Sequence, residues 1–272
     1  MNLRAVSRFL WMHAEFALAA VNFIRVCGLT PRTATLPARA SWLQQTARRL
    51  LRVLRIEVNS SGPTPTTGLL VCNHLSYLDI LVLASLSPTV FVAKREVKYW
   101  PIFGWFAQLA GTIFVQRNRR FPAAQAAAEI TAVLRSGTLV VLFPEGTSSG
   151  GSTILPFKTS LLEPALRPDQ PLTIACLSYE LSDGDVADEV CYWRDMTLVP
   201  HLINLLGKKW VRAAVQFLPV QNRAPNRKAL ATQLHAEMVT LNALSAFAPP
   251  EICRTPAARP RRFSVSTSGL SP

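Results

Sequence analysis

The chain has 272 residues, of which 49% are hydrophobic and only 17% are charged. This balance excludes a largely disordered chain, and the length allows one large domain with a complete core. Lys and Arg outnumber Asp and Glu by 29 to 16, so the formal net charge of +13 favours anionic partners such as lipid headgroups, phosphorylated substrates or nucleic acid.

The five cysteines and four histidines are scattered along the chain. No C-x-x-C spacing and no His/Cys cluster occurs, so the sequence predicts neither a disulfide framework nor a bound metal. A reducing compartment fits these cysteines. Apart from charge, no motif points to nucleic acid, and we expect none as a partner.

The first element is the apolar stretch at residues 9–27, which resembles a membrane segment. His13 and Glu15 interrupt it, and Glu15, Asn22 and Arg25 fall within about 80° of one another on a helical wheel. Polar residues in these places are unfavourable in a free-standing span and in a signal sequence. The pattern favours a helix that lies in, or dips into, the membrane interface.

A second amphipathic helix follows a Pro- and Thr-rich link at residues 30–37, and we expect Ser41 to cap it. Its two sides differ sharply, and an ordinary surface helix or a membrane-surface helix would both fit. We favour the membrane surface and assign residues 1–55 to an N-terminal membrane-associated element. Arginines on one side are Arg48, Arg49, Arg52 and Arg55, and apolar residues on the other are Trp42, Leu43, Ala47, Leu50, Val53 and Leu54.

From residue 56 to 248, short apolar strands alternate with helical stretches, which is typical of an α/β domain with a mixed central sheet flanked by helices. The basic tail at 249–272, rich in Pro, Arg and Ser, is expected to be disordered. Strands are predicted at 68–72, 89–93, 112–115, 138–143, 172–178 and 211–219, and helices at 76–86, 122–136 and 226–244.

A polar segment, residues 73–79, separates two apolar runs. Histidine can accept and return a proton near neutral pH, and a carboxylate on its other nitrogen would fix its tautomer. His74 and Asp79 are candidates for such a pair. Five positions along one regular helix would place them about 140° apart, so a turn must lie between them. We expect His74 on a strand-to-helix loop, with Ser76 as the helix N-cap and Asp79 in the first turn.

The same residues allow a second interpretation. Ser76-x-x-Asp79 also resembles a capping box, in which Asp79 would merely satisfy backbone N–H groups at the start of the helix. On the local sequence alone, both interpretations stay open.

Two further strand ends carry polar side chains. The strand at 112–115 runs into an arginine cluster that includes Arg117, and Arg is suited to a bidentate grip on phosphate or carboxylate. A solvated strand end is the alternative. The strand at 138–143 ends at Pro144-Glu145-Gly146-Thr147, which is either a floor for a polar ligand or a loop rich in turn formers.

Residues 146–150 also match G-x-S-x-G, the nucleophile elbow of serine hydrolases, with Ser148 at its centre. Asp195 with His201 or His235 could complete a triad. The context is poor because glycines and Pro156 follow where an elbow requires a helix. Cys72 is a candidate thiol nucleophile, although a cysteine that closes an apolar strand is usually inert.

Together and in this order, these segments resemble the glycerolipid acyltransferase family typified by 1-acyl-glycerol-3-phosphate acyltransferase. The resemblance covers roughly residues 50 to 220. Asn73-His74-x4-Asp79 resembles its H-x4-D motif, Gly111 to Arg117 its G-x-I-F-x-x-R motif, Phe143 to Thr147 its F-P-E-G-T motif and Pro156-Phe157-Lys158 its P-F-K element, and Leu172 to Tyr179 occupies the place of its last motif.

The resemblance implies an enzyme in which His74 is the general base that deprotonates a glycerol hydroxyl for attack on an acyl thioester. Asp79 would orient His74. The remaining motif residues would bind substrate. Arg117 is implied to hold the acceptor phosphate, Glu145 and Gly146 to shape its binding floor, and Thr147 and Lys158 to complete the substrate site.

Two departures bear on the acceptor. The family usually has Arg after F-P-E-G-T, where this chain has Ser148, and the last motif usually has a Pro that residues 174–177 lack. Lysophosphatidic acid, giving phosphatidic acid, is the first expectation, and another lysolipid such as lyso-ornithine lipid is the alternative. A non-catalytic protein that binds anionic lipid remains a competing class.

The resemblance also implies the partners and the location. We expect membrane lipids, a lysolipid acceptor and either acyl-CoA or acyl carrier protein as thioester co-substrate, with no separate cofactor. The expected location is the cytoplasmic face of a membrane, either peripheral or anchored by the N-terminal helix.

Overall fold

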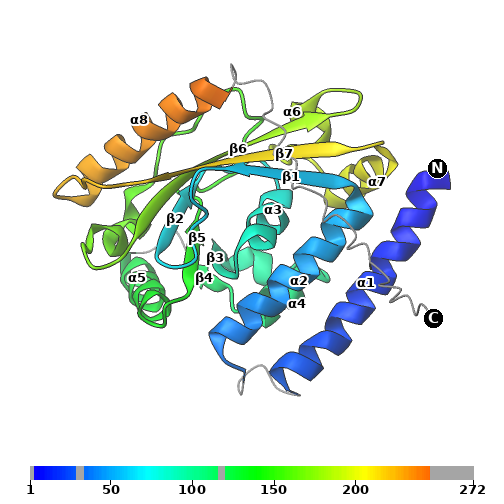
Figure 1. Cartoon of the computed structure of the whole chain (residues 1–272), viewed down its shortest axis with the longest axis horizontal. Coiled ribbons are helices and arrows are strands. Elements are labelled where there is room, and N and C mark those ends of the chain that lie inside the picture. Colours follow the sequence, from blue (N-terminus) through cyan, green and yellow to red (C-terminus); the bar gives the residue numbers. More distant parts are fainter. Residues whose placement is uncertain (1–2, 29–33, 116–119, 246–272) are drawn as a thin grey trace, which may run out of the picture.

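A computed structural model of the chain describes residues 3–28, 34–115 and 120–245. A seven-stranded sheet runs through the centre in the order β1-β7-β6-β2-β5-β3-β4, with helices on both faces (Figure 1). Its strands are β1 (Ile56–Ser61), β2 (Leu69–Cys72), β3 (Thr89–Lys94), β4 (Ile113–Val115), β5 (Leu139–Leu142), β6 (Leu172–Leu181) and β7 (Val211–Pro219).

The described α-helices are α1 (Leu3–Cys27), α2 (Leu36–Leu54), α3 (Leu78–Leu86), α4 (Phe103–Leu109), α5 (Arg120–Arg135), α6 (Val186–Glu189), α7 (Leu198–Gly207) and α8 (Arg227–Ser245). Short 3-10 helices lie at η1 (Arg95–Tyr99), η2 (Thr159–Leu161) and η3 (Glu163–Leu166). Neighbouring strands are parallel except for β6 and β7, which are antiparallel. The prediction of an α/β fold with a mixed sheet is therefore confirmed.

Strand β2 is buried on both faces, and its side chains alternate between two hydrophobic cores. Leu69 and Val71 join the core that includes residues of α5 and α8, whereas Leu70 and Cys72 join the core that includes residues of α2 and α3. A four-residue strand without one polar side chain is what burial on both faces requires. The polar segment that follows β2 thus begins at the edge of a fully packed layer.

Helix α2 begins earlier than the sequence predicted. Thr35 is its N-cap and accepts a hydrogen bond from the Ala38 N–H, and a proline stands in the first turn, so the expected cap at Ser41 is wrong. Its apolar side packs inside the protein, against α1 and α3, and Trp42 is 1% exposed. This apolar side is therefore not available to a membrane, and the predicted membrane association of residues 1–55 stays a prediction.

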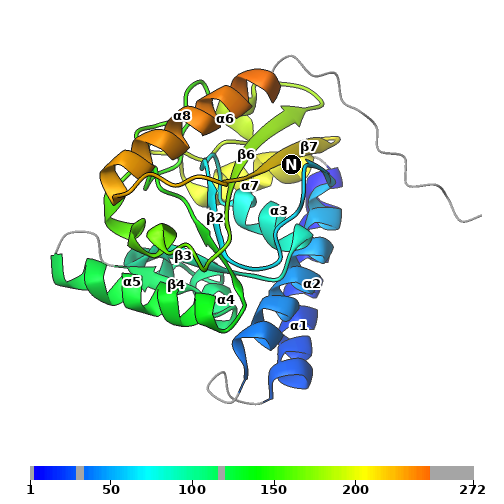
Figure 2. The same ribbon diagram turned by 60° about the vertical axis from the view of Figure 1, so that its left-hand side comes forward.

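Helix α1 lies lengthwise along α2 and reaches α7 (Figure 2). The Trp42 Nε1–H donates to the Ala19 carbonyl at 2.8 Å, and the buried Arg8 guanidinium donates to the carbonyls of Leu206 and Lys208 at the end of α7. By length and composition alone, α1 is long and apolar enough to cross a membrane. Its outer side exposes Leu3, Phe9, Leu10, Trp11, Leu18, Val21, Ile24 and Val26.

The other predicted elements all occur, with ends shifted by a few residues. β1, α4, α6, α7 and the three 3-10 helices were not predicted, and β6 extends three residues beyond its predicted end. The tail at 249–272 lies outside the described residues, so its predicted disorder stays a prediction.

Trp42→Ala tests whether α2 is a core helix. The indole stacks on Phe106 and meets Phe23 edge-on, so its removal should lower the free energy of unfolding by about 3–5 kcal/mol. The matched control is Trp105→Ala, because Trp105 is 51% exposed, and it should change stability by about 1 kcal/mol or less. Denaturant unfolding of both variants measures the contrast, and equal losses would contradict it.

Candidate active site

The candidate site lies at one edge of the sheet, where two parallel neighbours end. β2 and β5 pair in register, with Leu69 opposite Val140, so their carboxyl ends lie side by side. The loops that follow them, residues 73–77 and 143–151, therefore meet. In open α/β sheets this edge is where ligands usually bind.

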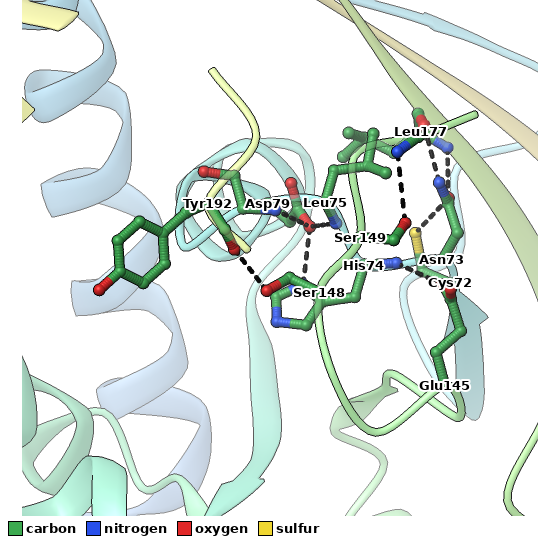
Figure 3. A network of polar contacts seen from close by, with 12 residues as sticks. Cys72, Asn73, His74, Leu75, Asp79, Glu145, Ser148, Ser149, Leu177 and Tyr192 are labelled. Atoms are coloured by element: carbon green, nitrogen blue, oxygen red, sulfur yellow. Dashed lines mark hydrogen bonds and ion pairs between the residues drawn. The ribbon is translucent and has the colours of Figure 1, made fainter. Parts of the chain in front are cut away.

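His74 and Asp79 form a direct pair. His74 Nδ1 lies 2.7 Å from Asp79 Oδ2, and Figure 3 shows the carboxylate between the His74 ring and the backbone of Leu75. A carboxylate only accepts hydrogen bonds, so Nδ1 carries a proton, and in the neutral imidazole Nε2 then has the lone pair. The His74 side chain is 22% exposed and that of Asp79 is 0% exposed, which leaves the imidazole as the reachable member.

Four donors converge on the Asp79 carboxylate. Besides the His74 ring, Oδ2 accepts the backbone N–H groups of Leu75 at 2.7 Å and Ser76 at 3.0 Å. Oδ1 accepts the Tyr179 hydroxyl at 2.7 Å. Burial, together with the neighbouring Asp79 carboxylate, raises the pKa of Tyr179 well above its usual value, so this phenol stays protonated and donates. The carboxylate is thus fixed from both sides.

The start of α3 combines both interpretations of the motif. Asp79 in its first turn satisfies two backbone N–H groups and also holds His74. The predicted N-cap at Ser76 is wrong, because α3 begins at Leu78 and the buried Ser76 Oγ has no hydrogen-bond partner among the described residues. The Asp79 N–H, which a serine cap would accept through its side chain, donates instead to the Ser76 backbone carbonyl at 3.1 Å.

The backbone of His74 is held on both sides. Its N–H donates to Glu145 Oε1 at 2.7 Å, and its carbonyl accepts from the Ser149 N–H at 3.0 Å. Its ring stacks on Phe143, with centroids 4.2 Å apart. All three contacts come from the loop after β5, so the two loops form one rigid unit around the imidazole.

Asn73 connects this unit to β6. Its side-chain oxygen accepts the Leu177 N–H at 2.7 Å, and its Nδ2 donates to the Leu177 carbonyl at 2.9 Å. The side chain therefore continues the β2–β6 ladder for one step after the β2 backbone turns away. This step also fixes β6 beside the site, which is how Tyr179 reaches Asp79.

Glu145 lies underneath the loop as an internal acceptor. It is 2% exposed, and its second oxygen accepts the Leu155 N–H at 2.9 Å. Burial raises the pKa of this carboxyl, against the opposing effect of the two backbone donors. The structure thus shows Glu145 positioning His74, and its predicted contact with substrate stays a prediction.

The other predicted binding residues surround this loop. Gly146 has φ +75°, a conformation that favours glycine, while Thr147 and the Lys158 side chain are exposed. The Lys158 N–H donates to the Pro144 carbonyl at 2.8 Å, so the chain brings the P-F-K and F-P-E-G-T segments together. Arg117 lies outside the described residues, and its predicted role stays a prediction.

The hydrolase interpretation finds no support in the geometry. The Ser148 hydroxyl donates to the Tyr192 carbonyl, and no helix follows it (Figure 3). His201 contacts the Tyr77 hydroxyl and the Cys191 carbonyl, and His235 contacts the Ile154 carbonyl. Within the described part of the chain, no histidine hydrogen-bonds Ser148.

Cys72 is fully buried, and burial raises the pKa of its thiol well above the usual range. This suppresses the thiolate that a nucleophilic cysteine requires.

Comparison with known proteins agrees with this geometry. A family model described as Acyltransferase matches residues 55–179, the stretch from the start of β1 to Tyr179. The lyso-ornithine lipid O-acyltransferase of Pseudomonas aeruginosa is 33% identical over 187 residues, which cover 68% of this chain and 72% of that protein. The chain belongs to this acyltransferase family.

The names of two other relatives state different lipid acceptors. A lyso-ornithine lipid O-acyltransferase of Rhizobium meliloti is 37% identical over 180 residues. A 1-acyl-sn-glycerol-3-phosphate acyltransferase of Neisseria gonorrhoeae is 33% identical over 153 residues. The matches cover 62% and 53% of this chain, and they span only 62% and 60% of the respective relatives.

The fold has a counterpart among solved structures. The crystal structure of the 1-acyl-sn-glycerophosphate acyltransferase from Thermotoga maritima aligns with a TM-score of 0.54 at 17% identity, over 90% of this chain and 99% of that one. At this identity the likeness concerns the fold alone.

Glu145→Gln tests whether the buried Glu145 carboxylate holds the two loops together by accepting backbone N–H groups. A glutamine side chain would turn an NH2 group toward one of the two backbone N–H groups, so we expect a loss of about 1–3 kcal/mol in the free energy of unfolding. Glu163→Gln, at a side chain that is 60% exposed, is the control and should stay within about 0.5 kcal/mol of wild type. Chemical denaturation measures both, and a wild-type value for Glu145→Gln would contradict the assignment.

Proposed function

We propose that this protein transfers a fatty acyl group from an acyl thioester to the free hydroxyl of a lysolipid, with His74 as general base. The observation that carries the proposal is the 2.7 Å contact between His74 Nδ1 and the buried Asp79, which leaves Nε2 as the free basic atom. Family membership supports acyl transfer as the class of reaction.

In the proposed reaction, His74 Nε2 removes the proton of the lysolipid hydroxyl while its oxygen attacks the thioester carbonyl. The carbon–sulfur bond then breaks, an ester remains on the lipid, and the imidazolium returns the proton to the departing thiolate. Asp79 stabilises the transient positive charge and prevents the ring from turning. No acyl-enzyme is required, because holding both substrates beside one base supplies much of the rate.

For the acceptor, we propose a lyso-ornithine lipid first. Relatives with that name from Rhizobium meliloti and Pseudomonas aeruginosa support it, as does Ser148, which places no cation after F-P-E-G-T. Lysophosphatidic acid is the second candidate, supported by the motif resemblance and by the Neisseria relative. Both acceptors present a hydroxyl and an anionic group, which is a carboxylate in the one and a phosphate in the other, so the same base serves either.

For the donor, we propose acyl-CoA or acyl carrier protein, since the net charge of +13 suits the phosphates of the one and the acidic surface of the other. We place the enzyme at the cytoplasmic face of a membrane. The exposed apolar side of α1 supports membrane association, and the packing of its other side on α2 and α7 supports a helix that lies in the interface.

His74→Ala and Ser148→Ala separate acyl transfer from hydrolysis. With a lysolipid and acyl-CoA, His74→Ala should lower kcat/KM by at least about 100-fold, since general-base catalysis typically contributes 10²–10⁴-fold. Ser148→Ala should stay within about tenfold of wild type, because it removes one hydrogen bond to a carbonyl. Thin-layer chromatography of labelled product measures both, and the reverse order would refute His74 as base.

The same assay with wild-type protein identifies the acceptor. Lyso-ornithine lipid and lysophosphatidic acid are each supplied with acyl-CoA and with acyl carrier protein. We expect a clear preference for lyso-ornithine lipid. A preference for lysophosphatidic acid would select the second candidate, and no acylated product from any combination would refute the proposed activity.

Leu10→Asp combined with Ile24→Asp tests the membrane surface of α1. Burying one such side chain contributes about 1.5–3 kcal/mol, so this variant should bind anionic vesicles at least tenfold more weakly. Val239→Asp with Leu244→Asp alters two exposed apolar side chains of α8 and is the control. Vesicle sedimentation compares them, and equal losses would show that α1 is not the membrane-binding element.

A further inference from the structure

The segment between α6 and α7, residues 190–197, is attached to both loops of the candidate site. The Tyr192 N–H donates to the Leu75 carbonyl at 2.8 Å, and the Tyr192 carbonyl accepts the Ser148 hydroxyl. The Tyr192 ring points away from His74 in Figure 3. The anchored backbone leads directly into Trp193 and Arg194, which the motifs do not include.

Trp193 packs against the loop that holds His74. Its Nε1–H donates to the Ala187 carbonyl at 2.8 Å, which fixes the indole from behind. A Cβ atom added to Gly150 would lie 2.7 Å from the indole ring, so only glycine permits this approach. The neighbouring Ser149 donates its backbone N–H to the His74 carbonyl. The indole is thus one residue removed from the backbone contact that positions the imidazole.

Arg194 lies on the face of this indole, with its guanidinium carbon 3.7 Å from the ring centroid. Its side chain is exposed, and in the part of the chain that the structure describes no Asp or Glu forms an ion pair with it. Stacking uses the face of a guanidinium and leaves the N–H groups at its edge available to a ligand.

The backbone of Arg194 is held in the left-handed region, with φ +54°. The residue carries a Cβ and a long side chain, so this conformation is unfavourable unless its surroundings impose it. Strain of this kind concentrates where a side chain must be aimed at a ligand. Here Arg194 lies in a turn in which the Met196 N–H donates to the Trp193 carbonyl at 3.4 Å, directly after the Tyr192 anchors.

We propose that Arg194, supported by Trp193, binds the anionic group of the lysolipid acceptor. This inference rests on the proposed function and specifies where the headgroup of the lysolipid acceptor binds. The loop after β5 has Ser148 where it could have carried a cation, and Arg194 supplies one from the neighbouring segment. A bidentate grip suits the carboxylate of an ornithine headgroup and the phosphate of lysophosphatidic acid equally, so the shared ligand is a planar or tetrahedral oxyanion.

Arg194→Gln tests the assignment by steady-state kinetics. Losing a charge-assisted contact should raise the KM for the anionic acceptor about tenfold, while kcat and the KM for acyl-CoA stay within about twofold of wild type. Arg135→Gln removes an exposed arginine from the end of α5, on the opposite face of the sheet, and should leave both KM values unchanged.

The acceptors distinguish the two oxyanions. Lyso-ornithine lipid is compared with its methyl ester, which lacks the carboxylate, and both are compared with lysophosphatidic acid. If the carboxylate is the ligand, wild type should prefer the acid over the ester and Arg194→Gln should abolish that preference. If phosphate is the ligand, the variant should lose affinity for lysophosphatidic acid. An unchanged acceptor KM, or a raised KM for acyl-CoA alone, would overturn the inference.

Arg194→Gly separates binding from folding. Glycine relieves the left-handed conformation, so the melting temperature should stay the same or rise while the acceptor KM still increases. A fall in melting temperature with an unchanged acceptor KM would mean that Arg194 is structural. If wild type acylates nothing, calorimetric titration with a short-chain lysolipid still tests Arg194, because Arg194→Gln should weaken that binding about tenfold relative to Arg135→Gln.

Discussion

The convergence of four hydrogen-bond donors on the Asp79 carboxylate is the constraint on which the rest of the site depends. Those donors come from the His74 ring, the backbone before α3 and the Tyr179 hydroxyl of β6. A buried carboxylate without such partners would be strongly unfavourable. The strand, turn and helix must therefore assume one relative position before the charge can be buried. In that position the His74 side chain remains partly exposed, whereas Asp79 is fully buried.

The loop after β5 supports this arrangement through contacts within the protein. Each Glu145 carboxylate oxygen accepts a backbone N–H group, and Phe143 stacks on the imidazole. Glu145 and Phe143 thus support the neighbouring loop. Because both Glu145 oxygens already accept backbone N–H groups, we propose that a cation beside this segment, Arg194, binds the headgroup.

The spacing of His74 and Asp79 predicted their contact because five residues across a turn leave few geometries. Tyr179 was beyond reach of that reasoning, since its approach depends on the β2–β6 register and on the Asn73 side chain that prolongs it. The position of the apolar side of α2 could not be predicted from the sequence, for a different reason. An amphipathic pattern records that a face avoids water, and it reads the same whether a bilayer or another helix covers that face.

The attachment of α1 has a geometric consequence for the proposed catalysis at a bilayer. Its inner side is fastened by the Trp42 indole and by the buried Arg8 guanidinium, so the helix cannot sink away from the domain without breaking both. With a helix about 10–12 Å across, the interfacial orientation admits immersion to roughly one helix thickness. In the proposed interfacial orientation, α1 would limit how deeply the domain enters the bilayer. A lysolipid would then reach His74 by moving out of the membrane toward the edge of the sheet.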